Sequence, residues 1–248
     1  MPNLLDASYG VNYRKVHPLL LMDRDANHLI YLTMLLQRLG YRIWSASSAE
    51  EASDLSAMAM PSLIIVSVGI AQTDDLSLVE RLRTDPRTAS IPVIALLPEG
   101  DLIGEQRCRA AGVRTCLSRP VQAEELYRSI QRIVEPNPRR NIRIPLQLPV
   151  SLDNHALDFA AGECVTELSA QGVNVRTVRP APVHARLAVR ITLGGRPVSA
   201  DAVVLYSSRS DSGVVRGSGM GLAFDRIAPE DEEYIRRYIR DKVLSGLR

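Results

Sequence analysis

Five short apolar stretches in the first half of the chain, each followed by a helical pattern, constrain the fold more than any other feature. The first stretch is Leu19–Met22, and Ala26–Leu39 then carries leucines at helical spacing until Gly40 stops the helix. The last stretch is Thr115–Leu117, followed by a helix over Ala123–Val134. Short strands that alternate with helices predict an α/β doubly wound, five-stranded parallel sheet covered on both faces. The other expected strands are Arg42–Ser45, Leu63–Val66 and Val93–Leu96, and the other helices begin at Ser48 or lie around Leu76–Leu82 and Glu105–Ala111.

From Ile144 onward the pattern changes to alternating and β-branched runs. Gly194–Gly195 is a hairpin signal between two such runs. Pro229 begins a helix with an acidic first turn and basic later turns, an order that complements the helix macrodipole. These features predict a small antiparallel β-barrel with a C-terminal helix. The expected strands include Leu146–Leu152, Gly172–Arg176, Ala185–Ile191, Ala202–Tyr206 and Met220–Phe224.

The change of pattern divides the chain into four predicted segments. These are an N-terminal tail over residues 1–16, an α/β domain over 17–135, a linker over 136–143 and a barrel domain over 144–248. A Pro-Asn-Pro sequence marks the joint. A chain of 248 residues is long enough for two domains that each bury a core.

Charge and composition argue against several functions. A net charge of +2 is too small for general attraction to nucleic acid polymers, so an anion site must be local. The three cysteines are odd in number and show no metal-ligand spacing, so we predict reduced thiols and no metal site. We expect a cytoplasmic protein without membrane insertion, because no apolar stretch is long enough to span a bilayer and no signal-peptide core is present. No nucleophile–base pair is recognisable, so we expect no enzymatic activity.

An arginine cluster directly after the proline joint is the strongest candidate for a binding site. Guanidinium groups pair bidentately with phosphate and with the edge of guanine, and they stack on purine faces. An E-x-S-x-x-G turn follows about two dozen residues later. Taken singly, these residues are also compatible with a solvated linker, a salt bridge at the barrel edge and an ordinary turn. The candidates are Arg139, Arg140 and Arg143 in the cluster, and Glu167, Ser169 and Gly172 in the turn.

The first domain resembles the receiver domain of bacterial response regulators. The resemblance rests on Leu20–Asp23, Ser47–Ala52, Ile91–Ile94 and Ser118–Pro120. A receiver carries an acidic pair after its first strand, a phosphate-accepting Asp after the third, a Ser or Thr after the fourth and Lys-Pro after the fifth. In this chain only the first acid and the proline are kept.

Four positions depart from the receiver pattern. Arg24 replaces the second acid, Ser67 the phosphate acceptor, Leu97 the hydroxyl residue and Arg119 the lysine. Mg²⁺ needs negatively charged oxygen ligands, and a serine without an adjacent base is a poor nucleophile. We therefore expect a degenerate site without magnesium-dependent phosphorylation, in which Arg24 and Arg119 pair with Asp23. The domain is then a protein-docking or dimerisation module, or alternatively a folded spacer.

The second domain, from Arg139 to about Leu247, resembles the PilZ domain, a bacterial receptor for the second messenger cyclic di-GMP. The resemblance rests on the arginine cluster, the E-x-S-x-x-G turn, the strand Gly221–Phe224 and the C-terminal helix. It implies that the arginines grip phosphates and guanines, that Ser169 offers its hydroxyl and that Gly172 lets the backbone turn and approach the ligand. Glu167 stands where the family has a shorter Asp or Asn, so the carboxylate is kept but displaced.

Together the resemblances imply a cyclic di-GMP receptor and effector in motility or biofilm regulation. Ligand binding at the linker arginines and the barrel surface would reorient a receiver-like domain that docks a protein partner. The alternative is a ligand-independent adaptor in which both small-molecule sites are degenerate. A homodimer is left open, and no cofactor other than the ligand is expected.

Overall fold

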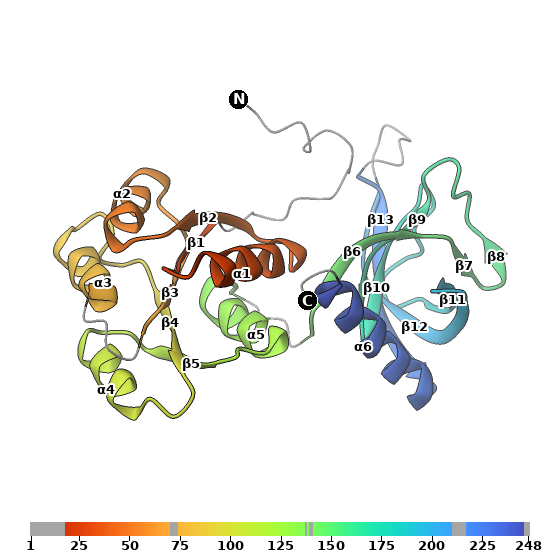
Figure 1. Ribbon diagram of the computed structural model, residues 1–248. Helices are drawn as coiled ribbons and strands as arrows, with labels where there is room; N and C mark the ends of the chain where they lie inside the picture. Colours follow the sequence, from red (N-terminus) through yellow and green to blue (C-terminus); the bar gives the residue numbers. More distant parts are fainter. Residues whose placement is uncertain (1–17, 70–73, 137, 139–140, 210–216, 246–248) are drawn as a thin grey trace. The chain divides into compact units, whose positions relative to one another are not determined.

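The computed structural model describes residues 18–69, 74–136, 138, 141–209 and 217–245. The described residues divide into two compact units, one before Asn141 and the other over Asn141–Ser245 (Figure 1). We call them the α/β domain and the β domain and describe each by itself. The predicted tail, Arg139 and Arg140 lie outside the described residues.

The α/β domain contains the predicted parallel sheet, with strand order β2-β1-β3-β4-β5. Strand β3 is buried along its whole length, because α1 and α5 cover one face of the sheet and α2, α3 and α4 cover the other (Figure 1). The predicted fold class is thus confirmed, and the carboxyl ends of the strands meet at one edge. The elements are β1 (Pro18–Met22), α1 (Ala26–Arg38), β2 (Arg42–Ala46), α2 (Ala49–Ala59), β3 (Leu63–Ser67), α3 (Asp74–Thr84), β4 (Val93–Pro98), α4 (Leu102–Ala110), β5 (Thr115–Arg119) and α5 (Ala123–Val134).

The start of α2 shows a modified cap. The Ser48 hydroxyl accepts a hydrogen bond from the Glu51 amide at 3.2 Å. The Glu51 carboxylate, however, accepts from the amide and the hydroxyl of Ser47 at 2.8 and 2.9 Å. A helix start at Ser48 was predicted, and Ser48 caps it; the returning bond of the Glu51 side chain, however, goes to Ser47, the residue before the N-cap.

The end of α2 leaves one residue in an unfavourable backbone conformation. Met60 closes the helix with φ 45° and ψ 61°, in the left-handed region, and its side chain is half exposed. A residue with a Cβ atom loses about 1–2 kcal/mol there, whereas glycine does not. We predict that Met60→Gly raises the free energy of unfolding of the α/β domain by about 0.5–1 kcal/mol in denaturant titrations.

Met58→Gly is the matched control for this prediction. Met58 is also exposed, but it lies inside α2 with helical neighbours on both sides. Glycine there should lower the free energy of unfolding by about 1 kcal/mol. Equal losses of stability in the two variants would contradict the conformational argument.

The β domain is an all-antiparallel sheet that curls into a barrel-like shape and is followed by a C-terminal helix, as predicted (Figure 1). Its strand order is β6-β9-β10-β13-β12-β11-β7-β8. The elements are β6 (Arg143–Leu148), β7 (Val150–Leu152), β8 (His155–Ala156), β9 (Cys164–Ser169), β10 (Gly172–Arg176), β11 (Arg186–Leu193), β12 (Arg196–Ser208), β13 (Gly219–Ile227) and α6 (Pro229–Leu244).

Two strand predictions in this domain need correction. The run expected over Leu146–Leu152 is two strands separated at Pro149, because proline lacks the amide N–H that a ladder uses. Strand β9 was not predicted, and Glu167 belongs to it rather than to a turn. Thr166 is an extra residue opposite β10, and this bulge interrupts the alternation that would have indicated a strand.

The hairpin between β11 and β12 is fixed on α6. Gly194 and Gly195 form its two-residue turn, both with positive φ, as predicted from the Gly-Gly signal. Arg196 pairs with Asp231 at 2.6 Å and lies 4.6 Å over the ring of Tyr234, whose hydroxyl donates to a β11 carbonyl. These contacts dock the helix against one end of the sheet.

Candidate functional site

Four predicted ligand residues lie together on one face of β6, β9 and β10. The strand register places Arg143 opposite Ser169, and Ser169 opposite Gly172. Glu167 lies two residues before Ser169 on β9 and so faces the same side of the sheet. The structure therefore brings these four residues into one row of neighbours. The positions of Arg139 and Arg140, outside the described residues, remain a prediction.

Arg143 and Glu167 form a loose ion pair across β6 and β9. The Arg143 guanidinium and the Glu167 Oε2 atom are 3.8 Å apart, beyond hydrogen-bonding distance. Glu167 Oε2 is buried and accepts no hydrogen bond from the residues that the structure describes. A buried acceptor without a donor is unfavourable by about 1–3 kcal/mol, so this carboxylate can gain from an N–H group of a ligand. From the sequence, Arg143 was interpreted either as a ligand contact or as part of a salt bridge at the barrel edge. The salt bridge is present as this weak ion pair.

Ser169 has a role inside the hairpin. Its side chain is buried, and its hydroxyl donates to the Gly172 carbonyl at 3.1 Å. Only Ala170 and Gln171 lie between β9 and β10, so this bond closes the turn. The predicted contact of the hydroxyl with a ligand would have to form in addition to it or in its place.

The close approach of the β13 backbone explains why residue 172 is a glycine. It is not among the described glycines with positive φ, so a turn of the backbone is not the reason for glycine here. A Cβ atom at this position would lie 2.2 Å from the Leu222 carbonyl oxygen and 3.2 Å from the Ala223 Cα atom. The close approach expected from the sequence exists, but it is an approach between two strands.

Asn141 and Gln171 contribute contacts that the sequence did not predict. The Asn141 side-chain amide donates to the Gln171 side-chain carbonyl at 2.8 Å. The backbone carbonyl of Gln171 accepts from the Phe224 amide at 3.0 Å. The first described residue after Arg140 is therefore tied to the hairpin turn. Both residues occupy variable positions of their motifs, which is why the pattern carried no signal for them.

The same face of the sheet continues toward β12. Asn174 lies opposite Glu167 and Gly221, and Gly221 lies opposite Tyr206. The Tyr206 ring packs directly over Gly221, where no Cβ atom would fit, and is 42% exposed. An exposed aromatic ring beside amide and carboxylate groups is a surface on which a planar base can stack.

The receiver-like site in the α/β domain is organised around a histidine. Asp23 is almost fully buried; its Oδ1 atom accepts from the Asp25 amide at 2.9 Å, and its Oδ2 atom makes a short hydrogen bond with His28 Nδ1. Burial raises the pKa of Asp23, but the hydrogen bonds to His28, Ser67 and the Asp25 amide outweigh it and hold the pKa below its usual value. The Ser67 hydroxyl does not reach regular hydrogen-bond geometry, so we assign most of this effect to His28.

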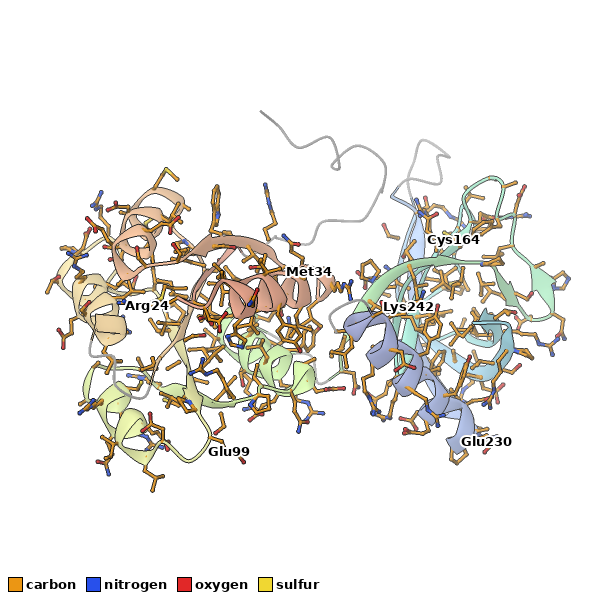
Figure 2. The ribbon with its side chains drawn as sticks, in the orientation of Figure 1. Arg24, Met34, Glu99, Cys164, Glu230 and Lys242 are labelled. Atoms are coloured by element: carbon orange, nitrogen blue, oxygen red, sulfur yellow. The ribbon has the colours of Figure 1, made fainter. Side chains whose placement is uncertain are left out.

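Arg24 and Arg119 at this edge were expected to pair with Asp23, and the structure gives Asp23 a different partner. Arg119 donates to the Val68 carbonyl at 3.0 Å, beyond the end of β3. Arg24 is exposed just after β1 (Figure 2). The partner that the structure gives the buried carboxylate is His28 on α1, and this replaces the predicted pairing with Arg24 and Arg119. A histidine five residues after the acid gave no recognisable motif signal.

The remaining receiver-like positions are buried. Ser67 is the last residue of β3 and is 5% exposed. Leu97 on β4 is 4% exposed and belongs to the hydrophobic core. In the part of the chain that the structure describes, no group of three or more His, Cys, Asp and Glu side chains is arranged to hold a metal ion.

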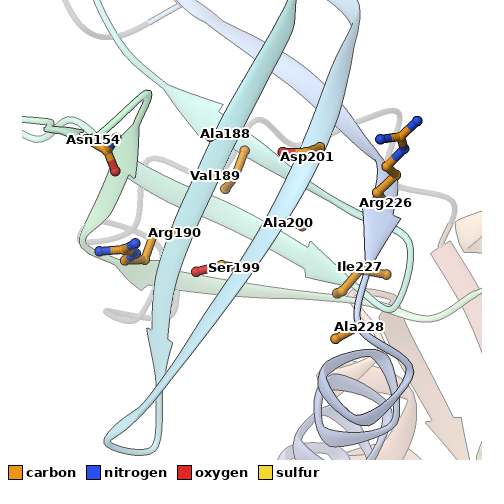
Figure 3. A pocket seen from close by; sticks show the side chains of 10 residues that line it. All are labelled: Asn154, Ala188, Val189, Arg190, Ser199, Ala200, Asp201, Arg226, Ile227 and Ala228. Atoms are coloured by element: carbon orange, nitrogen blue, oxygen red, sulfur yellow. The ribbon is translucent and has the colours of Figure 1, made fainter.

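A hollow of about 300 Å³ in the β domain lies away from the predicted ligand residues. It is formed by β11, β12 and the end of β13, and its polar side chains include Arg190, Asp201 and Arg226 (Figure 3). The two arginines point in different directions (Figure 3).

Comparison with protein families gives two matches that together cover most of the chain. Residues 19–131 match the response regulator receiver domain, and residues 137–241 match the PilZ domain. These matches confirm both predicted resemblances. No helix in the described ranges is long and apolar enough to cross a membrane.

Individual relatives are more distant. The chain is 27% identical over 127 residues to the DNA-binding dual master transcriptional regulator RpaA of Synechocystis, covering 51% of each chain. It is 29% identical over 153 residues to the response regulator PleD of Caulobacter vibrioides, covering 62% of this chain and 31% of that protein. The chain thus spans about half or less of these two relatives. A putative response regulator structure from Chloroflexus aurantiacus is 29% identical, with a TM-score of 0.45, and the match covers 48% of this chain and 97% of that one.

Proposed function

Because the chain consists of a response regulator receiver domain followed by a PilZ domain, we propose that it is a receptor and effector for cyclic di-GMP. The two domains support a signalling protein that binds this dinucleotide, and both are typically regulatory and non-catalytic. The observation that carries the proposal is the row of Arg143, Glu167, Ser169 and Gly172 on one face of the PilZ domain.

The chemistry of this row matches the two parts of the ligand. The forked donors of Arg143 suit a phosphate or the O6/N7 edge of guanine. The buried Glu167 oxygen, which accepts no hydrogen bond within the described part of the chain, suits the N–H groups of guanine. Arg139 and Arg140 precede Asn141, which is tied to the hairpin turn, so we assign them the remaining contacts with the phosphates.

We propose that the ligand acts by ordering the joint between the domains. The arginines belong to this joint, so a ligand that bridges them to the sheet changes the range of orientations open to the receiver domain. A protein partner would then dock on the receiver domain in one arrangement and not in the other.

Small-angle scattering tests this mechanism. We expect the scattering profile of the full chain to change on saturation with cyclic di-GMP, with the radius of gyration differing beyond experimental error. Arg143→Ala at the same ligand concentration is the control, and its profile should remain that of the free protein. Superimposable profiles of the native chain at demonstrated saturation would contradict the mechanism while leaving the receptor assignment intact.

We further propose that the receiver domain works without phosphorylation. Ser67 is buried, and the neighbouring carboxylate of Asp23 is itself buried and hydrogen-bonded to His28, so it is not a free base for the serine hydroxyl. We predict no transfer of phosphate from acetyl phosphate with Mg²⁺, measured by intact mass, under conditions that label an ordinary receiver domain. Stoichiometric labelling that Ser67→Ala abolishes would contradict this prediction.

One observation favours the alternative of a ligand-independent adaptor. Arg143 already faces Glu167, and the Ser169 hydroxyl is already bonded within the turn. A site whose groups are already partly engaged with one another gains less from a ligand. The two functions differ in one measurable property, which is saturable binding of cyclic di-GMP by the folded chain.

A further inference from the structure

Two cysteines of the receiver domain lie side by side. Cys108 is in the last turn of α4 and is fully buried, and Cys116 is the second residue of β5 and is partly exposed. Cys116 packs against the buried cluster to which Cys108 belongs, and each thiol influences the pKa of the other. Both thiols are free.

The fold itself produces this proximity. Gly112, with φ 87°, reverses the chain after α4, and the Val113 amide donates back to the Cys108 carbonyl at 2.9 Å. Cys116 then pairs with Ala95 of β4. Paired residues of neighbouring strands share a face, and Ala95 belongs to the same buried cluster as Cys108. The strand register therefore places Cys116 on the face that α4 covers.

Cys116 is also accessible from outside. It lines a groove of about 650 Å³ that runs along the edge strand β5 between α4 and α5. Four arginines and three glutamates line the same groove, so its charged side chains favour small anions. The arginines are Arg109, Arg114, Arg128 and Arg132, and the glutamates are Glu105, Glu124 and Glu125.

We propose that Cys108 and Cys116 form a redox-active dithiol, which an anionic low-molecular-weight disulfide such as glutathione disulfide oxidises to an intramolecular disulfide. The Cys116 thiolate attacks one sulfur of the small disulfide, forms a mixed disulfide and releases one small thiol. Cys108 then loses its proton and attacks the Cys116 sulfur, which releases the second small thiol. The protein loses two electrons and two protons, and the small disulfide gains them as two thiols.

The local chemistry predicts a slow reaction that speeds up with pH. Burial raises the pKa of the Cys108 thiol to about 12 and also raises that of Cys116. Only a small fraction of Cys116 is therefore thiolate at neutral pH, and the rate of the first step should rise about tenfold per pH unit. The intramolecular disulfide would link the last turn of α4, which forms a wall of the groove, to β5, which forms its floor. This inference does not depend on cyclic di-GMP binding.

The test uses the folded full chain and glutathione disulfide at about pH 8, followed by an acid quench and intact mass spectrometry. We expect the loss of two hydrogen atoms without an adduct, and a peptide map that links Cys108 to Cys116. Cys164, a buried thiol of the β domain, should remain free (Figure 2). The peptide map of the native chain decides the matter without any variant.

Three variants separate the steps. Cys116→Ser should leave Cys108 unmodified, because Cys108 is fully buried. Cys108→Ser should accumulate a stable glutathione adduct on Cys116, and Cys164→Ser should form the same link as the native chain. The proposal is overturned if the folded native chain keeps three free thiols while its denatured form oxidises. A persistent adduct on Cys116 of the native chain would overturn it equally.

Discussion

Arg143→Ala should weaken the binding of cyclic di-GMP by about 100-fold or more. Arg143 carries forked, charge-assisted donors on a face shared with Glu167, and its side chain is about one-third exposed. Truncation of one partner in a charged hydrogen-bonded contact lowers affinity by about 2–5 kcal/mol, and about 2.7 kcal/mol corresponds to 100-fold. The loss has a second source, because the buried Glu167 carboxylate would lose the cation that faces it. Isothermal titration calorimetry of the purified chain measures the change.

Arg190→Ala is the matched control. Arg190 is exposed on β11, on the hollow shown in Figure 3, and its removal changes the net charge of the chain by the same amount. The Arg190→Ala variant should bind cyclic di-GMP with an affinity within about twofold of that of the native chain, because a remote surface charge is screened by salt. Arg143→Lys should lie in between, because the charge is kept but the fork is lost. Equal affinities for Arg143→Ala and the native chain would remove Arg143 from the site.

Gly172→Ala should destabilise the PilZ domain by about 3 kcal/mol. The added Cβ atom would lie 2.2 Å from the Leu222 carbonyl oxygen, an atom of the backbone that can move only if β13 moves. Overpacking of a well-packed interior usually lowers stability by about 1–3 kcal/mol, and a backbone clash belongs at the upper end. Denaturant or thermal unfolding followed by near-ultraviolet circular dichroism measures the loss.

Gly195→Ala separates the clash from the general effect of replacing glycine. Gly195 has φ 86°, but no atom lies within 4 Å of the position that its added Cβ atom would take, so only conformational strain remains. That strain should lower stability by about 1 kcal/mol. A Gly172→Ala protein with native stability but without ligand binding would show that glycine serves the ligand and not the contact with β13.

The α/β domain was predictable because its signals are local. Its central strands are short apolar runs, and the first helix has leucines at helical spacing and a stop signal at Gly40. The cap of α1 was not predicted: the Asp25 carboxylate accepts hydrogen bonds from the Asn27 and His28 amides. The order of the strands then follows from the fold family. Local patterns sufficed because the parallel sheet is buried on both faces.

The β domain was less predictable because its strands are defined by their partners. Strand β9 is irregular in sequence, since the Thr166 bulge shifts the alternation, and only pairing with β6 and β10 makes it a strand. The requirement for glycine at position 172 likewise comes from Leu222, about fifty residues later. No local pattern contains such long-range contacts.

The site residues likewise divide into those that a local sequence pattern identifies and those that depend on contacts formed only in the folded chain. The motif positions Arg143, Glu167 and Ser169 were identified because their types and spacing are informative. The pairing of His28 with Asp23 and the bond between Asn141 and Gln171 were not, because each depends on the final direction of two side chains. Side-chain direction is decided by packing, which the sequence alone does not display.

We propose above all that the folded chain binds cyclic di-GMP through the arginine cluster and the face of β6, β9 and β10. The most direct test is a calorimetric titration of the native chain with cyclic di-GMP, with Arg140→Ala and Glu167→Asp measured alongside. We predict saturable binding for the native chain, its loss in Arg140→Ala and tighter binding in Glu167→Asp. No saturable binding by a native chain shown to be folded would contradict the claim and favour the ligand-independent adaptor.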